Sequence, residues 1–237
     1  MSRKSRAKKK SSRLNIYASI FIAAILIISV GFYVISSQKP PPAASSTTNS
    51  TTATSGTIST SSGEGPYAIL NTSQGIIVMQ LFPNIAPTTV SNFESLANQG
   101  FYNDLVWHRI DAGFVIQTGD PNTRGAVNST RDTWGQGVGP YSEPLETNTN
   151  YPNNVGYVAI AHTSTSTSGG SQFYINLADN PSLNGDYTVF AMVIQGMNVV
   201  DALAALPVYT NSNSFTYDQP INADQALLIS VTISNTP

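Results

Sequence analysis

Cysteine is absent from the 237-residue sequence, so the chain can form no disulfide framework, thiolate metal site or cysteine nucleophile. Basic residues are also scarce beyond the N-terminal region. From residue 64 to the end there is no lysine and there are three arginines, against thirteen acidic residues, which gives a formal charge of −10. Such a negative surface argues against nucleic acid as a partner of this part of the chain.

Most basic residues lie near the N-terminus and precede an uncharged apolar segment. Residues 1–13 hold seven of the eleven basic side chains, and residues 14–35 carry no charge. This segment is long enough to cross a bilayer as a helix, which needs about 20 residues. The positive-inside rule then predicts a cytoplasmic tail, a signal-anchor helix and an extracellular remainder, in a single-pass protein of the cell membrane. A cleaved signal peptide is the alternative, but its apolar region is usually about 7–15 residues and ends at an Ala-x-Ala-like site, which does not follow closely here.

Residues 36–63 form a region of different composition. From residue 40 onward they are Pro, Ser, Thr, Ala and Gly almost throughout and carry no charge. Such a segment cannot bury enough apolar area to offset the loss of chain entropy, so it predicts a disordered, flexible linker. Residues 64–237 then remain as one globular domain of ordinary size.

Two segments of this domain show helical periodicity. Pro87 opens the first, and Gly100 stands where a C-terminal cap is expected. The second covers about 198–206 and ends before Pro207. The apolar residues expected on the buried faces are Val90, Phe93, Leu96 and Ala97 in the first helix and Val199, Val200, Leu203 and Leu206 in the second.

The rest of the domain favours short strands. A hairpin is predicted over 67–81, where turn residues separate two apolar runs. Further strand-like runs cover residues 114–118, 155–161, 172–177, 188–194 and 226–233. Many short strands with only two helices predict a mainly β fold, a closed or nearly closed antiparallel barrel with helices at its ends. Residues 121–154 lack periodicity, which is typical of a loop that is either functional or disordered.

Residues 107–120 place polar groups inside what looks like one apolar strand pair. Arg109 and Gln117 stand in β-favouring runs, where a buried charge must be paired or used. A concave functional site is one interpretation. The other is a barrel-surface arginine paired with Asp111 or Glu94. His108 is expected to face the core, because no Asp or Ser stands in a recognisable triad order.

Four sequence blocks follow one another through the domain. They are Ala86–Phe93; Trp107–Ile110 with Gly113–Asp120; Gly170–Ile175; and Leu183–Phe190 leading into Val193–Val200. The set resembles the cyclophilin-type peptidyl-prolyl cis-trans isomerases, whose second block is Phe-His-Arg followed by Gly-Phe-x-x-Gln-x-Gly-Asp. Any one block alone would be weak, but the ordered set spans about 65–233 and is specific.

The resemblance implies a closed eight-stranded antiparallel barrel capped by two helices, with a proline pocket on its outer surface. Arg109 matches the family's catalytic arginine, Phe114 lines the pocket, and Gln117 hydrogen-bonds near the substrate backbone. The other matching substrate-binding positions are Val115, Ala161, His162, Gln172, Tyr174, Leu183 and Tyr187. No cofactor and no metal are expected, since the acidic residues of the long loop lack the spacing of a calcium-binding loop.

The chemistry of prolyl isomerisation suits these residue types. Rotation about an X-Pro bond is slow because the nitrogen lone pair is delocalised into the carbonyl, with a barrier of roughly 18–20 kcal/mol. A guanidinium aimed at that nitrogen stabilises the lone pair as it localises in the twisted state. Three positions depart from the family pattern: Ser182 replaces a large aromatic, Tyr174 a phenylalanine, and Val115 a commoner methionine. These changes alter the shape of the pocket and bear on turnover and inhibitor sensitivity.

The leading hypothesis is a monomeric, membrane-tethered prolyl isomerase that acts on proline-containing polypeptides folding outside the membrane. Its lipid partner is the bilayer, through residues 14–35. The competing hypothesis is a non-catalytic proline-peptide binding module or chaperone tethered in the same way. A third is a structural surface protein whose linker displays a stable barrel.

Overall fold

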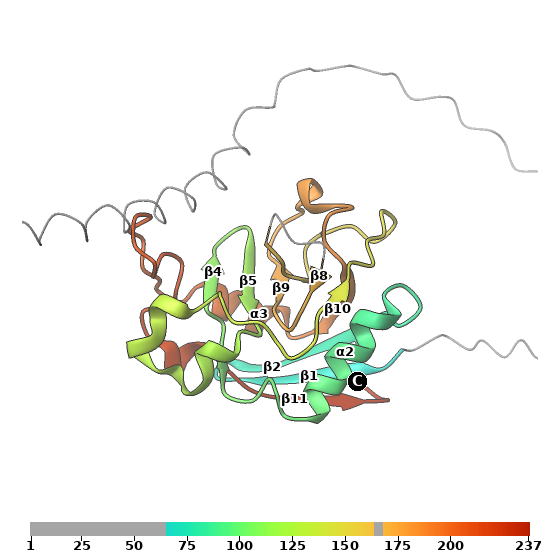
Figure 1. The fold of residues 1–237 in the computed structure, drawn as a ribbon, viewed down its shortest axis with the longest axis horizontal. Helices are drawn as coiled ribbons and strands as arrows, with labels where there is room; N and C mark the ends of the chain where they lie inside the picture. Colours follow the sequence, from blue (N-terminus) through green and yellow to red (C-terminus); the bar gives the residue numbers. More distant parts are fainter. Residues whose placement is uncertain (1–64, 164–167) are drawn as a thin grey trace, which may run out of the picture. The chain divides into compact units, whose positions relative to one another are not determined.

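The computed structural model describes residues 65–163 and 168–237 (Figure 1). The predicted basic tail, apolar segment 14–35 and linker 36–63 lie outside the described residues. None of the helices in the described part of the chain is long and apolar enough to cross a membrane.

One nine-stranded antiparallel sheet forms the framework of the domain, and two short strands make a second sheet. The strands of the large sheet are β1 (Tyr67–Thr72), β2 (Gly75–Leu81), β3 (Leu105–Val106), β4 (Arg109–Asp111), β5 (Val115–Thr118), β7 (Tyr157–Ile160), β9 (Phe173–Asn176), β10 (Val189–Gln195) and β11 (Leu227–Ser234). Their spatial order is β3-β11-β1-β2-β10-β7-β9-β5-β4. The second sheet pairs β6 (Glu143–Pro144) with β8 (Ser168–Gly169).

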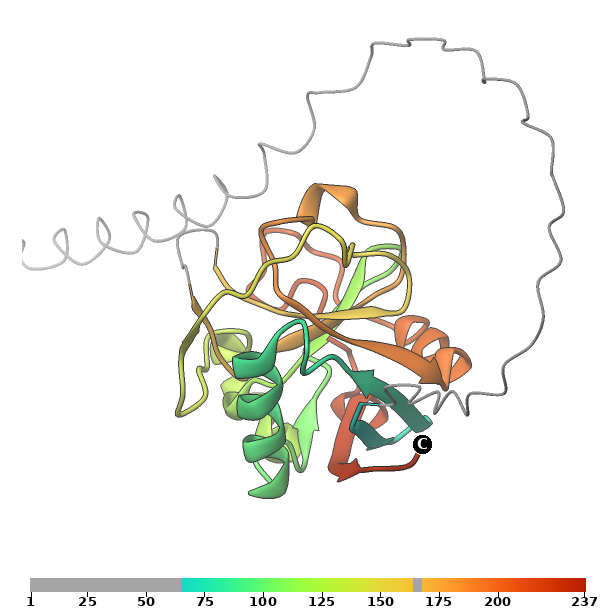
Figure 2. The same ribbon diagram turned by 90° about the vertical axis from the view of Figure 1, so that its right-hand side faces the viewer.

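The prediction of a closed eight-stranded barrel is wrong in two respects. The large sheet has nine strands, and its ladder stays open between β3 and β4. These two strands follow each other along the chain, but each bonds to another segment: Leu105 of β3 pairs with Leu228 of β11, and Ile110 N–H of β4 donates to Asp218 O at 2.8 Å. The sheet therefore curls into a half-barrel (Figures 1 and 2).

The strands predicted from sequence are otherwise found close to their expected positions. The hairpin over 67–81 is β1 and β2, and Ser73 and Gln74 form its turn because Thr72 pairs with Gly75. The other five predicted runs fall on β5, β7, β9, β10 and β11. Strands β3, β6 and β8 were not anticipated, since two residues are too few to show a period of two.

Two α-helices cover the half-barrel, as predicted. Helix α2 (Pro87–Asn98) buries Val90, Phe93, Leu96 and Ala97 and packs on β11. Gly100 follows its C-cap with φ of 68°, the left-handed conformation that glycine adopts at little cost. Helix α3 (Met197–Ala204) packs on β2 and is shorter than expected, so Leu206 lies beyond its end, partly buried against the core.

Helix α2 begins without a side-chain cap of its own, because Ala86 occupies the N-cap position. Glu146 of the long loop takes that role. Its carboxylate accepts from Thr88 N–H at 3.0 Å and from Thr89 N–H and Oγ1, both at 2.8 Å. Burial alone would raise the pKa of Glu146, but these hydrogen bonds outweigh it and lower the pKa.

The loop 121–154 is folded rather than disordered. Short 3-10 turns cover Pro121–Ala126 and Asn128–Thr133, and the carboxylate of Asp120 accepts main-chain N–H bonds from Asn122, Gly135 and Gly137. The guanidinium of Arg131 lies 4.5 Å from the centre of the Trp134 ring. Contacts made by side chains thus hold this loop in place, although its sequence shows no periodicity.

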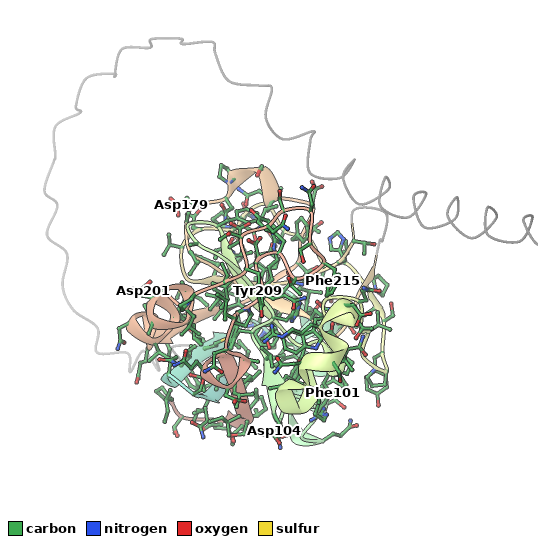
Figure 3. All side chains as sticks on the ribbon, turned by 90° about the vertical axis from the view of Figure 1, so that its left-hand side faces the viewer. Phe101, Asp104, Asp179, Asp201, Tyr209 and Phe215 are labelled. Carbon is green, nitrogen blue, oxygen red and sulfur yellow. The ribbon has the colours of Figure 1, made fainter. Side chains whose placement is uncertain are left out.

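The segment between α3 and β11 folds back on itself. Tyr209 N–H donates to Gln219 O at 3.0 Å, and Asp218 N–H donates to Tyr209 O at 3.0 Å. Tyr209 and Phe215 expose their rings on this segment (Figure 3). The side chain of Asp218, at its base, is largely buried.

Apolar side chains pack on both faces of the sheet. Ile116, Val158, Phe173, Ile175 and Phe190 belong to the main core. Their strand neighbours Val115, Ala159, Tyr174 and Val189 point to the other face and form a second cluster. This alternation is the period of two expected of strands. We call the second cluster, with the half-buried residues packed against it, the outer apolar cluster.

Candidate active site

The outer apolar cluster gathers most of the site residues predicted from sequence. Buried Val115 and Tyr174 form part of its base. The partly buried residues packed against it include Phe114, Ala161, Leu183 and Tyr187, together with Phe82, Tyr151 and Tyr157. Segments more than 60 residues apart in the sequence therefore meet on one face of β5, β7 and β9. An apolar surface bordered by half-buried rings is suited to holding a proline ring.

Three rings contact one another in sequence along one border of this cluster. The imidazole of His162 lies 4.3 Å from the ring of Tyr187 at an interplanar angle of 25°, and Tyr187 meets Tyr174 edge-on at 5.8 Å. The Tyr174 hydroxyl donates to Asn153 Oδ1 at 2.8 Å, a partner that the sequence did not reveal. Burial raises the pKa of both tyrosines, so both phenols are neutral at physiological pH.

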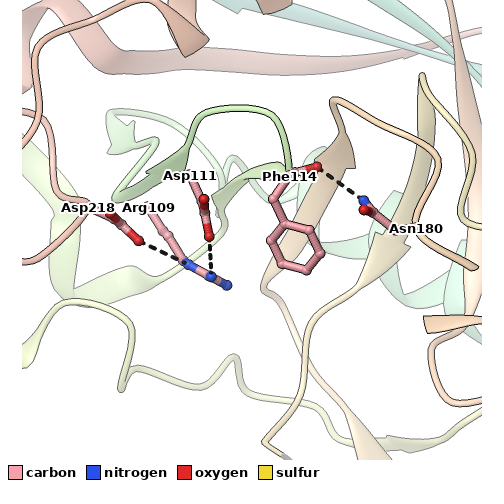
Figure 4. Close-up of polar contacts among 5 residues, drawn as sticks. All are labelled: Arg109, Asp111, Phe114, Asn180 and Asp218. Carbon is pink, nitrogen blue, oxygen red and sulfur yellow. Dashed lines mark hydrogen bonds and ion pairs between the residues drawn. The ribbon is translucent and has the colours of Figure 1, made fainter. Parts of the chain in front are cut away.

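Arg109 lies beside the cluster on β4. Its guanidinium carbon is 5.6 Å from the centre of the Phe114 ring, a cation–π distance. Nη2 is 2.9 Å from Oδ2 of Asp111, and Nε is 3.9 Å from Oδ2 of Asp218 (Figure 4). Of the two partners named for a surface arginine, Asp111 is paired with Arg109, and no ion pair with Glu94 occurs among the described residues. The contact of Asp218 with Arg109 was not predicted, because no sequence pattern indicates which loop residue will meet a strand residue so far away in the chain.

Gln117 connects the arginine strand to the rest of the site. On β5 it stands opposite Arg109 of β4 and opposite Tyr174 of β9. Its Nε2 donates to Gln172 Oε1 at 2.8 Å, and Gln172 Nε2 donates in turn to Gly137 O at 2.7 Å. This orientation leaves the side-chain carbonyl of Gln117 with no hydrogen-bond donor among residues 65–163 and 168–237. That oxygen can accept from a substrate N–H.

Ala161 and His162 were expected to form a strand edge that pairs with the substrate main chain, and the structure supports this only in part. The N–H of Ala161 already donates to Gln172 O at 2.9 Å, so main-chain pairing with a substrate cannot use it. The ring of His162 lies within 2.9 Å of the carbonyl oxygens of Thr163 and Asp186. His162 therefore contributes to the site mainly by its stacking on Tyr187.

His108 lies in the core, as predicted, and is not part of this site. It is 3% exposed, and burial is the main cause that lowers its pKa to about 4, against an opposing effect of Asp120. Within the described ranges there is no group of three or more His, Cys, Asp or Glu side chains that could hold a metal ion.

Comparison with known proteins identifies a family. Residues 67–225 match the family model described as cyclophilin type peptidyl-prolyl cis-trans isomerase/CLD. The chain is 38% identical over 154 residues to peptidyl-prolyl cis-trans isomerase-like 3 of Rattus norvegicus, covering 65% of this chain and 88% of the relative. It is 34% identical over 165 residues to peptidyl-prolyl cis-trans isomerase-like 1 of Homo sapiens, covering 70% and 92%.

A solved structure shows the same fold. A cyclophilin-type peptidyl-prolyl cis-trans isomerase of Cryptosporidium parvum, crystallised in the presence of the dipeptide Ala-Pro, superposes with a TM-score of 0.60 at 25% identity. The match covers 71% of this chain and 98% of that one. Family model, relatives and fold agree, and the chain belongs to the cyclophilin-type peptidyl-prolyl cis-trans isomerases.

Proposed function

We propose that the domain accelerates rotation about X-Pro peptide bonds by placing Arg109 against the amide that twists. The observation that carries this mechanism is the position of the Arg109 guanidinium at the border of the outer apolar cluster, 5.6 Å from the Phe114 ring. A proline ring seated on the cluster would put its nitrogen next to a fixed cation. The preceding residue would then be free to rotate towards solvent.

Charge stabilisation supplies the barrier reduction. The uncatalysed barrier of roughly 18–20 kcal/mol reflects the loss of amide resonance, which returns the lone pair to the proline nitrogen. A guanidinium N–H directed at that lone pair interacts more strongly with the twisted state than with either planar state. The nearby apolar side chains reduce the local dielectric constant and so strengthen this interaction. The carbonyl oxygen of Gln117 holds the substrate main chain in register.

Proline-containing polypeptides are the proposed substrates. The Cryptosporidium relative was crystallised in the presence of Ala-Pro, which supports this substrate class. Ser182 is exposed at the position next to Leu183, where many family members carry a large aromatic. We expect this border to leave room for different residues before proline.

The test compares catalysis with binding in the full-length protein, kept in a mild detergent. Exchange of a short fluorescent X-Pro peptide between cis and trans is followed by NMR, and its affinity by fluorescence anisotropy. Acceleration of exchange by catalytic amounts of protein supports the isomerase. Binding without acceleration would contradict it and favour the alternative, a non-catalytic proline-peptide binding module.

The proposal includes a location. Seven basic side chains followed by 22 uncharged residues support a single-pass anchor at 14–35, with the domain extracellular. Fractionation of cells that produce the full chain, or the chain without residues 1–39, tests the anchor. Membrane recovery of the first and release of the second are expected. Recovery of the full chain in the soluble fraction, or resistance of the domain to protease added to intact cells, would contradict it.

A further inference from the structure

Both ion pairs found among residues 65–163 and 168–237 converge on one cation. Asp111 approaches Nη2 of Arg109, and Asp218 approaches Nε (Figure 4). Contacts at two different nitrogens fix the rotation of a planar guanidinium as well as its position. The other two described arginines, Arg124 and Arg131, bond instead to carbonyl oxygens of the chain.

Asp218 is held in place independently of the arginine. Its N–H donates to Tyr209 O at 3.0 Å and its carbonyl accepts from Ile110 N–H at 2.8 Å, which docks the segment on β4. Its φ of 62° is a left-handed conformation that Asp tolerates better than most residues. The Asp218 side chain is only 13% exposed, against 40% for Arg109. The carboxylate is thus a fixed point to which a more exposed cation is attached.

We propose that Asp218 and Asp111 are positioning residues that hold the guanidinium of Arg109 at the border of the outer apolar cluster. This inference rests on the proposed function of Arg109. The two carboxylates contact Nη2 and Nε, and no described residue bonds to Nη1. One end of the guanidinium therefore stays open towards substrate while the other is anchored.

Charge balance explains why two carboxylates, the anchors Asp111 and Asp218, lie beside one arginine. Two carboxylates close together repel each other, and burying one of them without a hydrogen-bonded partner is unfavourable. Arg109 lies between them and offsets both effects. The anchors also weaken the positive potential that Arg109 offers to substrate, so their contribution is orientation, which catalysis requires within a fraction of an ångström.

The anchor at Asp218 depends on pH. Burial and, to a lesser extent, the nearby charge of Asp111 raise the pKa of Asp218 to about 6, against the opposing effect of Arg109. The charged groups facing Asp218 are Arg109 and Asp111, both on β4, while Tyr209 contacts it through the main chain. As pH falls through about 6, Asp218 loses its charge and Arg109 keeps one anchor, the more exposed Asp111. We therefore expect kcat to fall in that range.

The test uses the full-length protein with Asp218→Asn, which keeps the shape and removes the charge. The control is Asp224→Asn, an exposed carboxylate without an ion pair in the described part of the chain. We expect Asp218→Asn to lower kcat at pH 7.5 on the order of 10-fold with little change in KM. Its profile should lack the inflection near pH 6 that the wild type and Asp224→Asn show. A wild-type kcat and an unchanged inflection would overturn the inference.

A second measurement separates this inference from the proposed function. The Arg109 Nε–H resonance, assigned by its loss in Arg109→Lys, reports the anchoring without any turnover. Slow hydrogen exchange in the wild type and faster exchange in Asp218→Asn are expected, even if the protein proves inactive on the test peptide. Equal exchange would refute the anchor while leaving catalysis by Arg109 intact. Should Asp218→Asn unfold, Asp111→Asn on the exposed side gives the same comparison.

Discussion

The side-chain amide of Gln117 on β5 donates a hydrogen bond to the side-chain carbonyl of Gln172, the residue that precedes β9, with an N–O distance of 2.8 Å. This bond fixes which end of the Gln117 amide is available to substrate. Without it the amide is free to rotate, and the oxygen that we assign to the substrate main chain is lost from its position part of the time.

Replacing Gln172 with leucine should therefore impair catalysis without unfolding the domain. We expect Gln172→Leu to reduce kcat/KM about 5- to 30-fold, the scale of one lost hydrogen bond of roughly 1–2 kcal/mol. Gln136→Leu is the control, since Gln136 is an exposed glutamine on the loop 121–154. The peptide exchange assay measures the activity of both variants. Equal activity would show that catalysis does not depend on the orientation of the Gln117 amide.

Phe114 should be needed to bind the proline ring. Its ring packs against the outer apolar cluster and faces the Arg109 guanidinium. Phe114→Ala removes apolar contact worth roughly 2 kcal/mol, so kcat/KM should fall about 30-fold, mostly through KM. Phe215→Ala is the control, because that ring is 69% exposed on the segment before β11 (Figure 3). Equal KM values for the two variants would place the ring-binding surface elsewhere.

Glu146 should stabilise the fold in a pH-dependent way. Its pKa is lowered in the folded protein, so its contribution is present above the unfolded pKa of about 4.3 and is lost as pH falls through the lower, folded pKa. Glu146→Gln should cost about 1 kcal/mol in the free energy of unfolding at pH 7, the usual loss at a helix N-terminus. Urea denaturation at pH 7 and pH 3 measures this. The same cost at both pH values would show that the charge of Glu146 is not responsible.

His108 should make the domain sensitive to mild acid. Its pKa of about 4 in the folded protein lies below the usual value near 6.5, so the unfolded chain binds more protons than the folded protein between these two pH values. Stability is therefore full above about pH 6.5 and falls as pH drops towards about 4, by on the order of 3 kcal/mol. His108→Phe should flatten this part of the stability profile, measured by urea denaturation. The chain has two histidines, so NMR can follow His108 directly, and titration of its ring near pH 6.5 would refute the assignment.

The parts of the fold that follow from local pattern were predictable. The spacing of Val90, Phe93 and Leu96 in the sequence predicted the buried face of α2. The candidate site residues Arg109, Phe114 and Gln117 came from the resemblance of one sequence block to a known family, and the structure places them close together on and between β4 and β5.

The parts that depend on contacts between distant segments were not predictable. Asp218 reaches Arg109, and Glu146 caps α2, only because loops without periodicity fold against strands and helices. The open edge between β3 and β4 likewise depends on where each strand finds its hydrogen-bond partners. A carboxylate in a loop looks the same in sequence whether it is solvated or anchors a cation.

The most direct test of the account measures the cis–trans exchange rate of an X-Pro peptide at saturation with full-length wild type, Arg109→Ala and Arg124→Ala. Arg124 is the matched control: it is exposed, and its guanidinium donates to the carbonyl oxygens of Phe101 and Asn103. Removing a charge that acts in the transition state should lower the rate on the order of 100-fold in Arg109→Ala, with the peptide still bound. Arg124→Ala should retain wild-type exchange. An Arg109→Ala protein that is folded, binds the peptide and catalyses exchange at the wild-type rate would contradict the central role of Arg109.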